Sequence, residues 1–131
     1  MKESKFQFLA PYLTQVHFEL NPEFDPEDKS CEIEMQNDFS VHIKKGKEEN
    51  RANVELVLEI NMDNENAPFK MKIGVASDFR WDDLPEKAVE SMLNINAPAL
   101  LLGYMRHVVA NITNSSNLPV YNLPFINFKE Q

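Results

Sequence analysis

The chain has 131 residues, with 21 acidic and 13 basic side chains and a formal net charge of −8. This balance excludes a typical nucleic-acid binder, which needs a basic surface to neutralise phosphates. The single cysteine excludes an internal disulfide framework, and no segment approaches the roughly 20 apolar residues of a membrane span. The N-terminus lacks the apolar run of a signal peptide. We therefore expect one soluble, cytoplasmic domain over residues 1–131, with no nucleic-acid and no membrane partner.

Four segments alternate apolar and polar residues with a period of two, which is typical of half-buried strands. They cover residues 6–20, 31–43, 54–62 and 69–75. Pro11 and Thr14 mark a bend in the first segment. Its apolar side consists of Phe6, Phe8, Ala10, Tyr12, Val16, Phe18 and Leu20. One-sided alternation predicts an antiparallel sheet with one face in water.

The period changes after these strands. Asp83 and Glu86 have the spacing of a capping pair and predict a helix over residues 84–94, with Pro85 tolerated in its first turn. A second helix is expected over residues 97–114, followed by a tail that its two prolines keep extended. The predicted fold class is therefore α+β: a four-stranded antiparallel sheet with one wet face, followed by two helices and an extended Pro-rich C-terminal segment.

The second helix is apolar over a wider arc than one sheet can cover. Its apolar side chains sweep about 200°, whereas a helix on a single sheet needs a stripe only somewhat over 100° wide. They are Ala97, Leu100, Leu101, Leu102, Tyr104, Met105, Val108, Val109 and Ile112. The tail, a second subunit or a bound polypeptide must cover the excess. In the simpler alternative, the first helix and the tail cover it within a monomer.

Catalytic chemistry finds no support in the sequence. The three histidines, His17, His42 and His107, fall on different elements, and no zinc, phosphate-loop or dinucleotide motif is present. Cys31 falls on the apolar side of its strand, which is typical of a buried and inert thiol. We therefore expect no enzyme activity, no metal and no cofactor.

Several aromatic and apolar side chains stand outside the predicted sheet and helices. Such residues either plug the core or line a groove, and both interpretations stay open for all of them. One belongs to a proline-rich acidic loop, two follow the fourth strand, and four belong to the tail. They are Phe24, Phe79, Trp81, Tyr121, Leu123, Phe125 and Phe128.

The last third of the chain combines a proline-initiated helix with a proline-spaced aromatic tail. The pattern consists of Ala97, Pro98, Leu101, Tyr104, Arg106, Leu118, Pro119, Asn122, Leu123, Pro124, Asn127 and Phe128. It resembles the C-terminal signature of the SecB protein-export chaperone family. The resemblance extends to the first strand, through Phe6, Tyr12, Phe18 and Glu19.

The resemblance implies a holdase that binds unfolded polypeptides without ATP. The loop around residues 22–29 would be the family's crossover between strands, and the aromatic residues above would line the client-binding groove. The resemblance also implies a homotetramer, built as a dimer of dimers with the long helix at a subunit interface. The expected interface residues are Leu101, Tyr104, Met105, Val108 and Ile112.

In this family the wet face of the sheet can dock the SecA motor through acidic residues. The corresponding candidates here are Glu19, Glu32, Glu34, Glu55, Glu59, Lys70 and Lys72. Lys70 and Lys72 stand where an apolar residue and an acid are expected, so SecA is a doubtful partner. A general export holdase and a dedicated chaperone of one client, such as an antitoxin, both remain open. Outside the chaperone class, the same groove could serve a small apolar ligand carrier or a single-partner interaction module.

Overall fold

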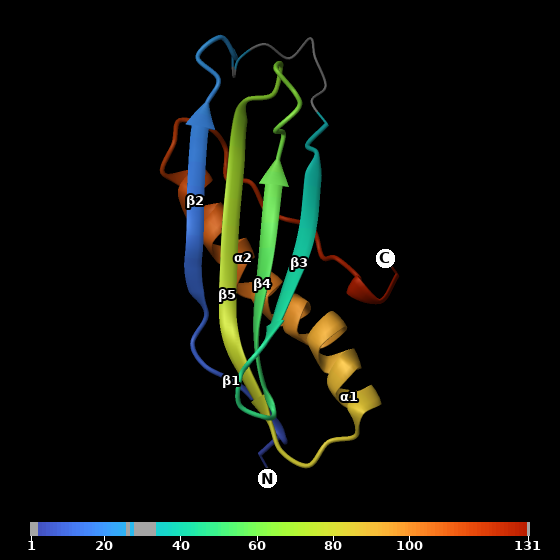
Figure 1. Cartoon of the computed structure of the whole chain (residues 1–131). Coiled ribbons are helices and arrows are strands. Elements are labelled where there is room, and N and C mark those ends of the chain that lie inside the picture. Colours follow the sequence, from blue (N-terminus) through green and yellow to red (C-terminus); the bar gives the residue numbers. More distant parts are fainter. Residues whose placement is uncertain (1–2, 26, 28–33, 131) are drawn as a thin grey trace.

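The computed structural model describes residues 3–25, 27 and 34–130. It contains one antiparallel sheet, with a long helical stretch and the C-terminal tail on one of its faces (Figure 1). The strands are β1 (Phe6–Phe8), β2 (Tyr12–Leu20), β3 (Asn37–Lys45), β4 (Arg51–Ile60) and β5 (Phe69–Trp81). Their order is β1-β5-β4-β3, and β2 also pairs with β5, further along that strand. We call the two faces of the sheet the helix face and the solvent face.

The α+β class and the antiparallel sheet confirm the prediction, but the sheet has five strands because the first segment is divided. Proline cannot donate to a ladder, and Pro11 falls in the break between β1 and β2. The pairing of β2 with β5 also shifts between Leu13 and Gln15, which is a bulge at Thr14. Gly74 lies opposite the bulge, where a Cβ would overlap the Thr14 hydroxyl.

The bulge corrects the predicted sidedness of the first segment. Tyr12 pairs with Ala76 and reaches the solvent face, where its hydroxyl accepts a hydrogen bond from Asn53 Nδ2 at 3.0 Å. Leu13 pairs with Val75 and lies on the helix face instead. After the bulge, the alternation continues as predicted, with Val16 opposite the buried Ile73.

The other strands alternate as predicted, and their helix-face side chains form the core. This core includes Val54, Leu56, Leu58, Ile60, Phe69, Met71, Ile73 and Val75. β5 is longer than predicted and contains Phe79 and Trp81, which were expected to follow it. The extension exists because β1 pairs with this end of β5, and the Phe6 ring stacks on Phe79 at 5.3 Å between centroids. Cys31 and Ile33, predicted to belong to the second strand, lie outside the described residues.

The two predicted helices are one continuous helical stretch. It consists of α1 (Glu86–Ser91), a π-helical segment (Met92–Asn96) and α2 (Ala97–Asn114). Pro98 lacks an N–H, and its ring would crowd the carbonyl of the residue four positions earlier in a regular α-helix. The wider π turn just before it lets the helix continue. The predicted capping pair does not form, because Asp83 has φ of 47° and no side chain caps α1.

The tail runs back along the helix face and ends in a 3₁₀ turn (Phe128–Glu130). The Tyr121 N–H donates to Thr113 Oγ1 of α2 at 2.9 Å, and the Tyr121 hydroxyl accepts from Asn37 Nδ2 at 2.7 Å. Leu123 and Phe128 are buried, and the Phe128 ring meets Phe39 of β3 edge-on at 6.3 Å. The tail therefore covers the β3 side of the helix face.

Candidate functional site

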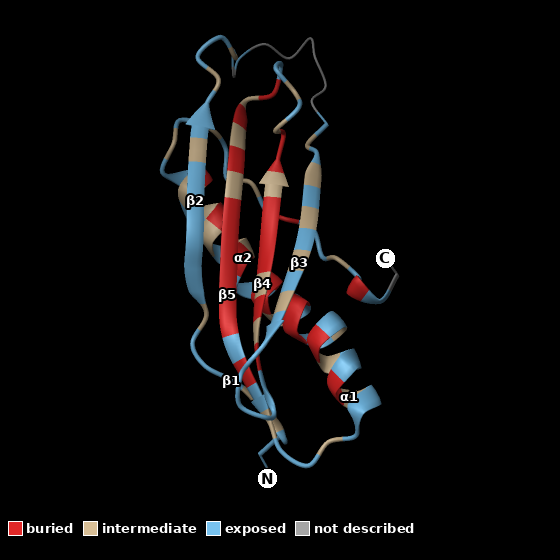
Figure 2. Cartoon of the chain, viewed as in Figure 1, coloured by how far each residue is buried: buried red, intermediate tan, exposed pale blue. Residues whose placement is uncertain are grey.

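The helix face of the sheet is covered unevenly. α2 contacts β4 and β5, and the tail contacts β3 through Phe128. Neither covers β2. Figure 2 shows the result as an exposed, pale blue β2 beside a largely buried, red β5. The candidate site is this uncovered part of the helix face.

The helix-face side chains of β2 are apolar but open to solvent. We call Leu13, Val16, Phe18 and Leu20 the β2 strip. Leu13, Val16 and Leu20 are 43%, 49% and 39% exposed, although their partners on β5 are buried. Because soluble monomers rarely leave large contiguous apolar surface uncovered, we take this strip as the candidate interaction surface.

Part of α2 continues the same apolar surface. Tyr104 is exposed, and Val108 and Ile112 are half-buried, all at the three- to four-residue spacing of one helix side. We call these three residues the α2 flank. A shallow hollow of about 430 Å³ joins Phe18 and Leu20 to Ile112 and the end of α2. One end of the β2 strip, Phe18 and Leu20, therefore adjoins Ile112 of the α2 flank across this hollow.

The structure corrects two of the predicted interface residues. Leu101 and Met105 are fully buried within the chain's own core, because they lie on the side of α2 that packs on the sheet. They are therefore not available to a second subunit. Tyr104, Val108 and Ile112 are accessible.

The structure does not bring the predicted groove residues together. Phe79, Leu123 and Phe128 are buried in the core and cannot line a surface groove. Phe24, Trp81 and Tyr121 are half-buried. Phe125 is 86% exposed, and Arg106 Cζ lies over its ring, 4.1 Å from the ring centroid. Tyr121 contacts Phe69 at one end of β5, whereas Trp81 ends that strand about 40 Å away. No feature of the sequence indicates that Trp81 and Tyr121 lie at opposite ends of β5.

The β2 strip was not predicted as a site, because its residues were assigned to the sheet core. One signal was available: Leu13 is apolar at a position where the alternation requires a polar residue. The exposure of Val16 and Leu20 could not be read from the sequence, since it depends on where α2 lies.

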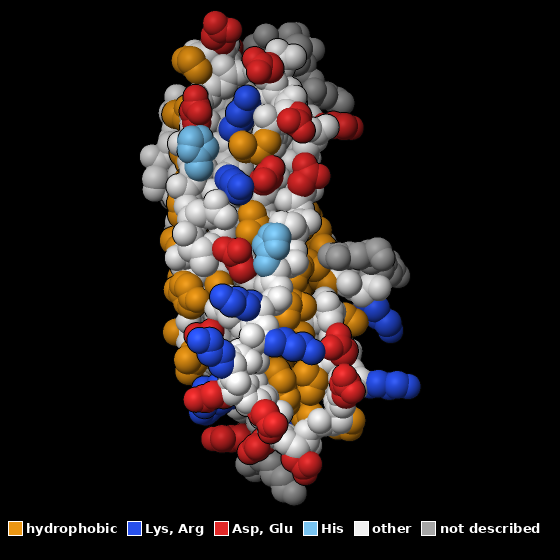
Figure 3. All heavy atoms as spheres, viewed as in Figure 1, with side chains coloured by type: hydrophobic (Ala, Val, Ile, Leu, Met, Phe, Trp, Pro, Cys, Tyr) orange, Lys and Arg blue, Asp and Glu red, His pale blue; other side chains and the backbone are white. Residues whose placement is uncertain are grey.

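The solvent face carries mixed charges, many of them paired (Figure 3). Lys72 Nζ lies 3.6 Å from Glu59, Lys70 Nζ lies 3.9 Å from Glu65, and His17 lies 3.5 Å from Glu19. Glu55 accepts a hydrogen bond from the Thr14 hydroxyl. Glu34 is exposed, and the predicted Glu32 lies outside the described residues. Both lysines therefore reduce the acidity of the predicted docking face.

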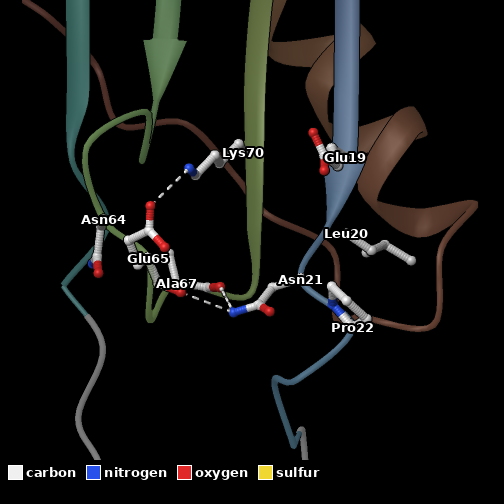
Figure 4. A pocket seen from close by; sticks show the side chains of 8 residues that line it. All are labelled: Glu19, Leu20, Asn21, Pro22, Asn64, Glu65, Ala67 and Lys70. Atoms are coloured by element: carbon white, nitrogen blue, oxygen red, sulfur yellow. Dashed lines mark hydrogen bonds and ion pairs between the residues drawn. The ribbon is translucent and has the colours of Figure 1, made fainter.

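One small hollow of about 130 Å³ opens at the end of β2 (Figure 4). Asn21 Nδ2 donates to the carbonyl oxygens of Glu65 and Ala67 at 3.1 and 3.0 Å, which ties this end of β2 to the β4–β5 turn. Asn21, Glu65 and Ala67, which make these hydrogen bonds, all belong to the lining of the hollow. We therefore assign it a structural role.

Over the described residues, no three His, Cys, Asp or Glu side chains are grouped so that they could hold a metal ion. No helix in this part of the chain is long and apolar enough to cross a membrane.

The fold is that of a small α+β protein, in which one antiparallel sheet is partly covered by a single helical stretch and one apolar strip stays uncovered. The chain belongs to the SecB family, because the family described as preprotein translocase subunit SecB matches residues 1–131. Members of this family are chaperones and not enzymes.

Curated relatives are similar to the chain at moderate identity. The protein-export protein SecB of Cellvibrio japonicus is 29% identical over 125 residues, which cover 95% of this chain and 74% of the relative. SecB of Anaplasma phagocytophilum is 34% identical over 63% of this chain and 56% of the relative. SecB of Neisseria meningitidis is 28% identical over 58% of this chain and 52% of the relative. The chain thus matches about half the length of the latter two relatives.

Two solved structures share the fold. The SecB-like chaperone Rv1957 of Mycobacterium tuberculosis, in complex with a ChAD peptide from the Rv1956 HigA1 antitoxin, aligns with a TM-score of 0.69. The alignment has 14% identity and covers 94% of this chain and 88% of that one. A Streptococcus agalactiae protein of unknown function aligns with a TM-score of 0.56 at 16% identity. The alignment covers 95% of this chain and 100% of that one. At these identities the likeness shows the fold.

Proposed function

We propose that the chain is an ATP-independent holdase that binds unfolded polypeptides on the β2 strip. The observation that carries this proposal is the exposure of Leu13, Val16 and Leu20 beside a fully packed core. Unfolded chains expose apolar side chains that can cover such a strip. Binding only the unfolded chain delays its folding by mass action, which is the activity of a holdase.

The geometry of β2 fits an extended client. In the described sheet, β2 pairs with β5 along one edge only, so its other edge offers unpaired backbone groups. An extended polypeptide can pair with such an edge while its alternate side chains contact the strip. Backbone pairing is independent of client sequence, and apolar contacts select for unfolded segments.

The α2 flank fits a second copy of the chain. Tyr104, Val108 and Ile112 follow one side of a helix, which suits packing against another helix rather than against an extended segment. We therefore propose that two copies pair through the α2 flank, as one of the two interfaces that a dimer of dimers requires. In this arrangement the β2 strip remains open to clients.

The test of the holdase proposal uses purified protein and reduced, carboxymethylated α-lactalbumin, which is permanently unfolded. Light scattering measures the mass of the protein alone and of its complex with this client. We expect an oligomer that binds the unfolded client without ATP and ignores native α-lactalbumin. A protein that binds neither form, or binds both equally, would refute the proposal.

We further propose that the client is dedicated, such as an antitoxin segment. The fold neighbour Rv1957 was solved with an antitoxin peptide, and Lys70 and Lys72 here neutralise acids on the solvent face. This arrangement weakens the acidic surface that docking to the SecA motor would require. Export clients and SecA are the alternative.

Changing Lys70 and Lys72 to glutamate tests the SecA alternative. The double variant removes two cations, adds two acids and frees Glu59 and Glu65, so we expect affinity for purified SecA to rise about tenfold. Calorimetric titration at low salt gives the affinity. Lys87→Glu on α1, which is exposed and away from this face, is the control for net charge. If the affinity does not rise above that of the control, the docking analogy does not transfer.

A further inference from the structure

The solvent face carries a basic hollow at the end of the sheet formed by the β3–β4 hairpin. Five cations and one acid belong to its lining, in a chain whose net charge is −8. The charged residues are Lys44, Lys45, Lys47, Arg51, Arg80 and Asp78. The hollow measures about 430 Å³. Figure 3 shows Lys and Arg side chains on the lower half of this face, interspersed with Asp and Glu side chains.

Strand register places three of these cations on the same side. Arg51 of β4 lies directly opposite Arg80 of β5, and Lys44 of β3 pairs with Asn53, two residues further along β4. Like charges directly opposite each other on a sheet are destabilising. An anionic group bound between the strands would offset this repulsion.

The chain's own acids neutralise only part of the cluster. Lys45 pairs with the buried Ala52 and so points to the helix face, where its Nζ lies 3.4 Å from Glu90 of α1. On the solvent face, Arg51 Nε lies 3.1 Å from Glu48. No carboxylate of the described residues lies within ion-pair distance of Lys44, Lys47 or Arg80. Among the described residues, Lys44, Lys47 and Arg80 thus have no carboxylate partner and can bind an anionic group.

The hollow also has an apolar element. Leu9, which follows β1, is 56% exposed and belongs to the lining. Asp78 already accepts a hydrogen bond from Asn53 Nδ2 at 3.0 Å, which offsets part of its charge within the site. A ligand that fits must combine carboxylates or similar anionic groups with an apolar side chain.

We propose that the basic hollow docks a short acidic peptide segment of a partner protein, with one apolar side chain against Leu9. From β3 through β4 and β5 to the β1 side, the lining spans about 14 Å. A single phosphate would reach Arg51 and Arg80, which lie opposite each other on adjacent strands, whereas a few extended acidic residues would also reach Lys44 on β3 and the Leu9 side of the hollow. An adjoining hollow shares Arg51 and Arg80 but includes Glu3, Glu49 and Asp82. These acids disfavour a broad anionic surface such as a membrane or a nucleic acid.

This site lies on the solvent face, opposite the β2 strip, so it does not rest on the holdase proposal. The test is calorimetric titration of the full chain with the peptide acetyl-Asp-Glu-Leu-Phe-Glu-Asp-amide at low salt. We expect saturable binding that weakens as salt is added. The Asn/Gln counterpart of the peptide, and the double variant Lys44→Glu/Arg80→Glu, should each lower the affinity about tenfold or more.

Two control variants separate binding in the hollow from effects of net charge and from binding on the β2 strip. Lys87→Glu changes the net charge outside the hollow and should leave the affinity unchanged, as should Leu13→Ser/Val16→Ser on the β2 strip. Because Arg80→Glu removes a like-charge pair, the double variant should melt no earlier than the parent. The proposal is overturned if the double variant binds the peptide normally, or if the peptide does not bind. It is also overturned if only phosphatidylserine vesicles or oligothymidylate bind.

Discussion

Replacing Leu13 and Val16 with serine is expected to weaken capture of an unfolded client about thirtyfold. Both side chains are half-exposed in the free chain, so a bound client would remove their remaining surface from water. Losing this burial costs about 1 kcal/mol for each residue, or about 2 kcal/mol together. The fold should lose little stability, because neither residue is fully buried. Titration with carboxymethylated α-lactalbumin gives the affinity, and thermal melting monitors the fold.

Two matched variants make this result specific. Val120→Ser removes a tail side chain of similar exposure (43%) outside the β2 strip and should leave client affinity unchanged. Tyr104→Ser/Ile112→Ser alters the α2 flank and should lower the oligomeric mass measured by light scattering. If Leu13→Ser/Val16→Ser binds the client as tightly as Val120→Ser, the β2 strip is not the client site.

The sheet could be predicted from the sequence because burial on one face imposes a strict alternation. Val54, Leu56 and Leu58 are buried as their spacing requires, while Glu55 and Glu59 on the same strand stay accessible. A one-residue slip would move all of these side chains to the wrong face. Local pattern and tertiary packing therefore agree over β4.

The errors occur where a local irregularity replaces regular geometry. The bulge at Thr14 adds one residue, so Tyr12 and Leu13 exchange faces relative to a continuous strand. Pro98 reads as a helix start, but the π segment before it lets the helix continue. In both places the sequence signals an interruption without indicating how the backbone resolves it.

The candidate site was the least predictable feature. An exposed aromatic and a buried one have the same local signature, so Phe125 and Phe79 could not be separated by sequence. Conversely, Val16 has the signature of a core residue and is exposed only because α2 lies over β4 and β5. Which part of the sheet α2 covers is decided by the whole fold and not by local sequence. The family resemblance indicated that an apolar surface exists, but not which residues form it.

A direct comparison of Phe79→Ala with Phe125→Ala tests this distinction. Phe79 is buried and its ring contacts those of Phe6 and Phe8, at 5.3 and 6.1 Å between centroids. We expect its loss to lower the free energy of unfolding by about 3–5 kcal/mol, because the core cannot fully collapse around the cavity. Phe125 is 86% exposed, and its truncation loses mainly the contact with Arg106, worth about 0.5–1 kcal/mol.

Urea unfolding of both variants measures the two losses under the same conditions, with unchanged m-values as the check that the comparison is valid. Client titration adds the functional half of the test. Because Phe125 stayed a predicted groove residue, a drop in client affinity for Phe125→Ala with intact stability would extend the client site to the tail. Equal stability losses for the two variants would contradict the assignment of Phe79 to the core and Phe125 to the surface.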